Sequence, residues 1–212
     1  KESSAASDVY KRQIYIKPVL PKERYSKIIV LDAGHGGSDP GASGNGLIEK
    51  NLTLSMLNKA RALFDSDGTI KCYATRTTDT YPSFNDRTDL GNEVGDAFIS
   101  IHINAAANTS AAGTETYSLY ANDQGNGLTS YGLASEILKN LLSQLGTKDR
   151  KVKSENWIVL RQSKIPASLI EIGFITNSGD AAIMGSDAGQ QKVAQAIFDS
   201  VKNLFNQYPP VR

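Results

Sequence analysis

The stretch KIIVLDA, residues 27–33, runs directly into the glycine-rich segment GHGGSDPG, residues 34–41. An almost unbroken apolar run of this length is typical of a strand buried on both faces of a parallel sheet. The glycines that follow remove side chains from the turn at the end of this strand. They serve one of two purposes: either they cradle a phosphate, or they clear space in which His35 can hold a ligand.

The rest of the chain continues this alternation of apolar strands and amphipathic helices. Further strands are predicted at residues 70–76, 97–104, 114–120, 157–160 and 168–174. Apolar residues at helical spacing predict helices at residues 49–64, 83–94, 133–145 and 193–205. Strands that alternate with helices in this way indicate a single α/β domain built around a mostly parallel sheet.

We place this domain at residues 27–212 and treat residues 1–26 as a partly flexible N-terminal extension. The extension opens with the polar stretch KESSAASD. It continues into an alternating run, residues 10–20, for which we expect an edge strand.

Composition excludes several classes of protein. The formal net charge of +1 gives no basic field for nucleic acid. No apolar run approaches the roughly 20 residues that a membrane-spanning helix needs. The single cysteine, Cys72, excludes an internal disulfide and a metal site with several cysteines.

Both histidines and two carboxylates map to one edge of the predicted sheet. His35 lies two residues beyond the first strand, and His102 lies near the end of the strand at residues 97–104. Glu49 opens the first helix, and Glu171 lies inside the apolar run SLIEIGF. Ligands of open α/β sheets bind at the carboxyl ends of the strands. Two imidazoles and one carboxylate form a known catalytic zinc set, and a second carboxylate can move the proton of a water.

Each of these residues also has an ordinary interpretation when it is taken alone. A loop histidine such as His35 is usually a surface residue, and His102 between two isoleucines can be a buried, hydrogen-bonded histidine. Glu49 can stabilise the start of a helix through the helix dipole. Glu171 can form a buried ion pair, since an unpaired carboxylate is costly in an apolar strand. The occurrence of all four residues at one sheet edge favours a metal site.

The phosphate alternative for the glycine-rich segment has little support. A dinucleotide-binding fingerprint that starts at Gly34 and Gly36 requires a glycine at position 39, where Asp39 stands. The sequence also contains no GK[ST] for a nucleoside-triphosphate loop. We therefore expect no nucleotide, and we expect the glycines to make room for His35.

Six motifs, taken in order, resemble those of the zinc-dependent N-acetylmuramoyl-L-alanine amidases of the amidase-3 family. They are KIIVLDAGHGGSDPGASGNGLIEKNLTL, TRTTD, DRTDLGN, FISIHINA, GTETYSL and WIVLRQSKIPASLIEIGFITN. The resemblance covers about residues 27–208. It implies a twisted, mostly parallel sheet flanked by helices on both faces. It also implies hydrolysis of the amide between the lactyl group of N-acetylmuramic acid and L-alanine in peptidoglycan.

The resemblance assigns roles to individual residues. His35, Glu49 and His102 are expected to bind Zn²⁺, with Glu171 as the catalytic carboxylate. The residues themselves, and not the resemblance, suggest three substrate contacts: Asn104, Arg76 and Arg87. Asn104, two residues past His102 on the same strand face, bonds either the substrate or a metal ligand. The two arginines are expected to bind stem-peptide carboxylates, with structural ion pairs as the alternative.

The same resemblance suggests where the protein acts. Compact members of the family, without a wall-binding module, resemble the spore-cortex amidases of endospore-forming bacteria. We therefore expect an extracytoplasmic enzyme of the cell wall or spore cortex, delivered or activated by a protein partner or a membrane anchor. One small departure from the family pattern is Gly91, where members often carry alanine.

Two other functions remain open from the sequence. A zinc peptidase of other specificity would share the metal, although the chain lacks HExxH. A catalytically silent peptidoglycan-binding module would keep the fold, although every catalytic position is filled.

Overall fold

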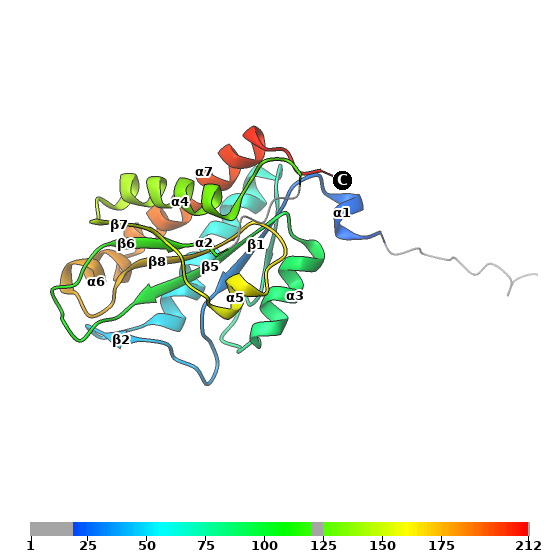
Figure 1. Ribbon diagram of the computed structural model, residues 1–212. Helices are drawn as coiled ribbons and strands as arrows, with labels where there is room; N and C mark the ends of the chain where they lie inside the picture. Colours follow the sequence, from blue (N-terminus) through cyan, green and yellow to red (C-terminus); the bar gives the residue numbers. More distant parts are fainter. Residues whose placement is uncertain (1–18, 120–124, 212) are drawn as a thin grey trace, which may run out of the picture.

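The computed structural model describes residues 19–119 and 125–211. Its centre is a twisted six-stranded sheet with the strand order β4-β1-β5-β8-β6-β7 (Figure 1). The strands of this sheet are β1 (Ile28–Ala33), β4 (Lys71–Ala74), β5 (Ala97–Asn104), β6 (Thr114–Tyr117), β7 (Asp149–Lys153) and β8 (Ala167–Phe174). Four of its five strand pairs are parallel, and only the β6–β8 pair is antiparallel. A short hairpin of β2 (Ser43–Gly44) and β3 (Leu47–Ile48) lies in the loop that follows β1.

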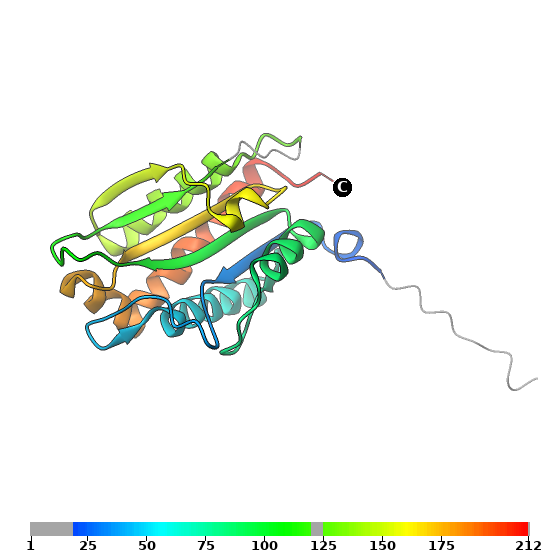
Figure 2. The same cartoon turned by 60° about the horizontal axis from the view of Figure 1, so that its bottom comes forward.

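Helices cover both faces of the sheet, as predicted (Figures 1 and 2). One face packs against α2 (Glu49–Asp67), α4 (Ser130–Leu145) and α7 (Asp187–Gln207). The other face packs against α3 (Phe84–Val94) and the one-turn helix α5 (Ile158–Arg161). The remaining helices are α1 (Pro21–Arg24) and α6 (Ser178–Gly185). No helix in the described ranges is both long and apolar enough to cross a membrane.

The two faces differ in how completely they are covered, and this difference leaves room for a site. Three long helices bury the first face along its length. On the second face, Phe98 and Leu169 belong to a smaller apolar cluster beneath α3 and α5. Successive side chains of a strand point to opposite faces. His102 and Glu171 therefore share the second face with Phe98 and Leu169, farther along the same strands. The carboxyl ends of β5 and β8 are thus open on this face.

Most predicted elements are confirmed, but one is wrong. Residues 157–160 were expected to be a strand, and the structure forms α5 there, with Arg161 N donating to Trp157 O at 2.8 Å. A short apolar run does not distinguish a buried strand from a helical turn. The sequence analysis also missed β7 and α6.

The edge strand expected at residues 10–20 falls mainly outside the described residues. Val19 and Leu20 are described and belong to no strand. The division into an extension (residues 1–26) and a catalytic domain (residues 27–212) stays a prediction.

Candidate metal centre

His35, Glu49 and His102 meet at the carboxyl edge of the sheet. The Oε1 atom of Glu49 lies 3.2 Å from His35 Nε2 and 3.1 Å from His102 Nδ1. Ligand atoms of the three side chains all lie within 4.8 Å of one another. The two imidazole rings meet edge to face, with their centroids 4.9 Å apart. The structure thus brings together the three residues predicted as metal ligands, and such a group can hold a metal ion.

The glycines of the loop after β1 make this approach sterically feasible. A Cβ atom on Gly34 would lie 2.5 Å from His102 Nε2 and 2.7 Å from His102 Nδ1. A Cβ atom on Gly41 would lie 2.6 Å from both Glu49 Oε2 and His35 Cδ2. Real Cβ atoms do not come so close to other atoms, so any side chain at these positions would displace the His–Glu–His group. The segment therefore clears space around the imidazoles, which was the second of the two purposes considered above.

Backbone amides fix the Glu49 carboxylate in place. Glu49 begins α2, and its Oε1 accepts a hydrogen bond from Ile103 N at 2.9 Å. Its Oε2 accepts one from Ala42 N at 2.8 Å. Burial raises the pKa of Glu49, but hydrogen bonds to His102 and His35 outweigh this effect and lower the pKa well below its usual range. The carboxylate is therefore ionised, which is the form that binds a metal.

Asp39 orients the His35 ring, a role that the sequence analysis missed. Its Oδ2 atom lies 2.8 Å from His35 Nδ1, so that Nε2 faces Glu49. Its Oδ1 atom accepts a hydrogen bond from Gly41 N at 3.1 Å. A carboxylate behind a ligating histidine fixes the ring orientation and makes the other nitrogen a better ligand. The available signal was an aspartate four residues after the only histidine of the loop.

Glu171 lies beside this group on the neighbouring strand β8. It is the register partner of His102 in the β5–β8 pair and is only 9% exposed. Its Oε2 is buried and accepts no hydrogen bond from any part of the chain that the structure describes. Burial raises the pKa of Glu171 well above its usual range, and the charges of Glu49 and Glu115 raise it further. The carboxyl is therefore free to take up and release a proton.

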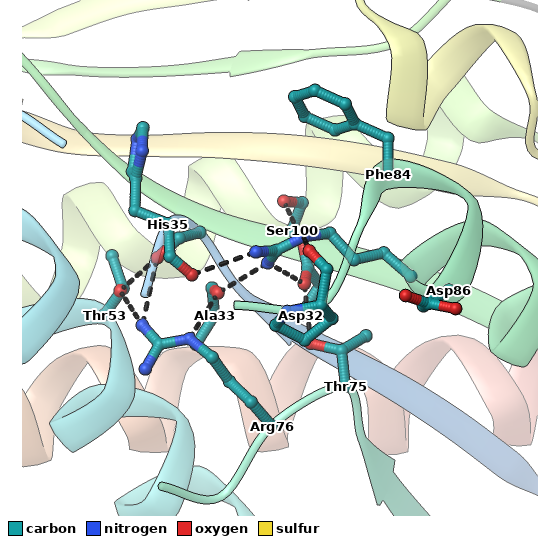
Figure 3. Close-up of polar contacts among 12 residues, drawn as sticks. Asp32, Ala33, His35, Thr53, Thr75, Arg76, Phe84, Asp86 and Ser100 are labelled. Atoms are coloured by element: carbon teal, nitrogen blue, oxygen red, sulfur yellow. Dashed lines mark hydrogen bonds and ion pairs between the residues drawn. The ribbon is translucent and has the colours of Figure 1, made fainter. Parts of the chain in front are cut away.

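Arg76 and Arg87 do not line the cavity at the metal group. Figure 3 shows Arg76 beside Thr53 and Ala33, on the far side of them from the His35 ring. Each arginine is 3% exposed, and each donates hydrogen bonds to backbone carbonyls of the loop. Arg76 reaches Gly34 O at 3.0 Å, and Arg87 reaches His35 O at 2.9 Å. Arg87 also forms a buried ion pair with Asp32 at 2.7 Å. These contacts favour the structural alternative, because the donors already hold the backbone that carries His35; substrate binding by the two arginines stays a prediction.

Asn104 is also absent from the lining of this cavity. Its Nδ2 donates to Glu115 Oε1 at 2.8 Å, and its Oδ1 accepts from Ala105 N at 2.8 Å. Its contact with the substrate stays a prediction. Glu115 and Asp32 are further buried carboxylates at this edge that the sequence analysis did not single out.

The Amidase_3 family, described as N-acetylmuramoyl-L-alanine amidase, matches residues 29–203. The sporulation-specific N-acetylmuramoyl-L-alanine amidase of Bacillus subtilis is 39% identical over 180 residues. That match covers 84% of this chain and 68% of the relative.

Solved structures give the same result. The catalytic domain of CwlV, an N-acetylmuramoyl-L-alanine amidase from Bacillus (Paenibacillus) polymyxa var. colistinus, has a TM-score of 0.79 and 29% identity. The CwlD amidase of Clostridioides difficile, solved in complex with the GerS lipoprotein, has a TM-score of 0.75 and 29% identity. Each match covers 85% of this chain and 98% of the solved chain. With the geometry of the His–Glu–His group, these matches identify the chain as a member of the Amidase_3 family of N-acetylmuramoyl-L-alanine amidases.

Proposed function

We propose that this amidase uses zinc, held by His35, Glu49 and His102, to hydrolyse the amide between the lactyl group of N-acetylmuramic acid and L-alanine in peptidoglycan. The observation that carries the proposal is the position of the Glu171 carboxyl. It is buried beside three side chains of ligating type, its Oε2 has no hydrogen-bond partner among the described residues, and the chain belongs to a family defined by this reaction.

The donor set fits zinc. Two imidazoles and one carboxylate, with an open position, are the ligands of many catalytic zinc sites. Asp39 holds His35 with Nε2 directed at the group, as expected for a ligating histidine. When bound, zinc supplies a Lewis acid that polarises the scissile carbonyl and lowers the pKa of water at the site.

The residues of the chain then have separate tasks. Glu171 takes the proton of the attacking water and passes it to the nitrogen of the leaving L-alanine, because no donor among residues 19–119 and 125–211 competes for its Oε2. His35 and His102 line the same cavity as Glu171, which is about 360 Å³ in volume. Arg76 and Arg87 keep the backbone at residues 33–35 in place, so that His35 does not move during the reaction.

The test is the Glu171→Gln variant, assayed with a synthetic muramoyl dipeptide and mass-spectrometric detection of the freed L-alanyl amine. We expect turnover to be lost while about one zinc per chain is retained. Glu93→Gln, an exposed glutamate on α3, serves as the matched control and should keep full activity. Retained turnover in Glu171→Gln would contradict the role of Glu171. Cleavage of casein but not of the dipeptide would favour the zinc-peptidase alternative, and failure to bind zinc under all conditions would favour the silent binding module.

We also propose that the enzyme acts outside the cytoplasm, on the cell wall or spore cortex, with a partner or anchor that delivers it. The sporulation-specific relative supports the cortex, and the CwlD–GerS complex shows that a similar amidase is found with a lipoprotein. A comparison of the rates at which the enzyme digests purified cortex and vegetative sacculi would show which of the two is its substrate. Full zinc occupancy of the isolated chain, together with a pull-down that recovers no partner, would count against activation by a partner.

A further inference from the structure

One wall of the cavity at the metal group is apolar. Besides the metal-group side chains, the cavity is lined by Phe84 from α3, by residues 156–159 around α5, and by Leu169 from β8. Phe84 is 47% exposed although it is a large apolar residue at the cavity mouth. Figure 3 shows the Phe84 ring and the His35 ring on the same side of Arg76. An exposed apolar surface beside a few polar groups is typical of a ligand-binding wall.

The side of the same edge formed by β6 and β7, which Trp157 reaches through its ring contact with Tyr117, is cationic. Glu115 is the register partner of Glu171 in the antiparallel β6–β8 pair, and it is 1% exposed. Its Oε2 accepts hydrogen bonds from Arg150 Nε at 2.6 Å and Lys153 Nζ at 2.5 Å. One buried carboxylate thus holds two cations of β7 next to Glu171, and the three side chains together carry a net positive charge.

These two cations keep donors that face solvent. The Arg150 side chain is 28% exposed and the Lys153 side chain 37% exposed. The Nη groups of Arg150 make no hydrogen bond to any described residue, and its guanidinium lies 4.7 Å from the centroid of the Phe174 ring. A guanidinium held in this way can bind a carboxylate through two parallel hydrogen bonds. Arg150 and Lys153 therefore offer what Arg76 and Arg87 do not: positive charge that a substrate can reach.

The spacing of the strands suits a short peptide. Strands β5, β8 and β6 are successive neighbours, and adjacent strands lie about 4.8 Å apart. Glu115 is therefore about 10 Å from the strand that carries His102. Two extended residues span about 7 Å. A peptide that leaves the metal group and crosses β8 toward β6 brings its second residue close to the two cations.

On the basis of the proposed function, we propose how the substrate lies across this edge. The muramoyl group, with its lactyl and N-acetyl methyl groups and the apolar face of its sugar ring, packs against the wall of Phe84 and Trp157. The acidic stem peptide runs past Glu171, and the first carboxylate after L-alanine binds Arg150 and Lys153. The muramoyl side of the amide carries no charge, whereas the stem peptide carries carboxylates, so each half matches the chemistry of its own end.

Two substrates test this orientation: muramoyl-L-alanyl-D-glutamate, and the same molecule with both carboxyls converted to amides. The intact enzyme should show a KM about tenfold lower for the acid than for the diamide. Lys153→Met should raise KM for the acid about tenfold and leave KM for the diamide unchanged. The comparison within one variant does not depend on how much of it is folded. Lys151→Met, an exposed lysine on the same strand, is the matched control.

Phe84→Ala tests the apolar wall. It should raise KM about fivefold for both substrates, with kcat and zinc content retained. Tyr131→Ala, which removes another exposed aromatic ring, should change neither constant. Equal loss of kcat/KM for acid and diamide in Lys153→Met, or unchanged KM values in Phe84→Ala, would overturn the orientation while leaving the proposed function intact. No turnover of either substrate by the unmodified, zinc-loaded enzyme would overturn both.

Discussion

Replacement of Arg87 with Met is expected to destabilise the protein far more than the loss of an ordinary ion pair. The Arg87 guanidinium lies 2.7 Å from Asp32 Oδ1, and both side chains are almost fully buried. Its other hydrogen bonds reach the carbonyl oxygens of Ala33, His35 and Pro82 at 2.8, 2.9 and 3.1 Å. Methionine keeps an unbranched stem but removes the charge and all four hydrogen bonds.

The expected loss of folding stability in Arg87→Met follows from the groups that remain around Asp32. Asp32 is 0% exposed, and among the described residues its carboxylate would keep two hydroxyl donors, Thr75 and Ser100, each at 2.6 Å. Removal of one partner of a buried ion pair costs about 3–5 kcal/mol, because the other charge stays buried without compensation. In a chain of this length 1 kcal/mol shifts Tm by about 2–4 °C. We therefore expect Tm to fall by roughly 6–20 °C.

Thermal unfolding measures Tm and urea unfolding measures the free energy of unfolding. Both are followed by circular dichroism, with EDTA present so that metal binding does not contribute. Lys139→Met is the matched control, because it removes the cation of an exposed pair with Glu136. This control should lower the free energy of unfolding by less than about 1 kcal/mol. The double variant Asp32→Asn with Arg87→Met should lose less than the sum of the two single variants, since no buried charge is left alone.

Two results would refute this reasoning. If Arg87→Met lowers the free energy of unfolding no more than the exposed control does, burial does not determine how much the Arg87–Asp32 pair stabilises the protein. Strict additivity in the double variant would show that the two side chains are not coupled.

The metal group yields three further predictions. Gly34→Ala should abolish zinc binding and activity, because the new Cβ collides with the His102 ring; full zinc content in this variant would contradict the geometry. Asp39→Asn should weaken zinc affinity about 10–100-fold, since it loosens the ring of His35, and competition with a chelating dye measures the change. Removal of zinc by EDTA should lower Tm and restored zinc should recover it, because an ion that binds only the folded chain stabilises it by mass action; an unchanged Tm would contradict the metal site.

The sequence predicted the location of the site because a general rule of sheet geometry applies to it. Parallel strands end at one edge, so residues near the ends of two apolar runs must lie close together. His102 and Glu171 follow this rule and are register partners in the structure. Glu49 could be placed with them because it begins a helix that starts at the same edge.

Other features depend on contacts between distant residues, which sequence patterns do not reveal. Arg87 lies 55 residues from Asp32 along the chain, and no local signal distinguishes a buried arginine from one that binds a substrate. Strand β7 was missed because its sequence, DRKVK, is charged and pairs with only one neighbour at the sheet edge. Charged residues are common on such edge strands, and they hide the alternation by which a strand is recognised.

The missed strand explains why two facing glutamates have different roles. Glu115 and Glu171 are directly opposite each other in the β6–β8 ladder, and both are buried. Burial raises the pKa of Glu115, but hydrogen bonds from Lys153, Tyr117 and Arg150 outweigh it, and its pKa falls below the usual value. No such donors reach the Oε2 of Glu171 from any described residue, and burial raises its pKa. Environments that separate the pKa values of two carboxyls assign their roles. By supplying two cations to one of them, β7 makes Glu115 a fixed charge and leaves Glu171 as the group that exchanges the proton.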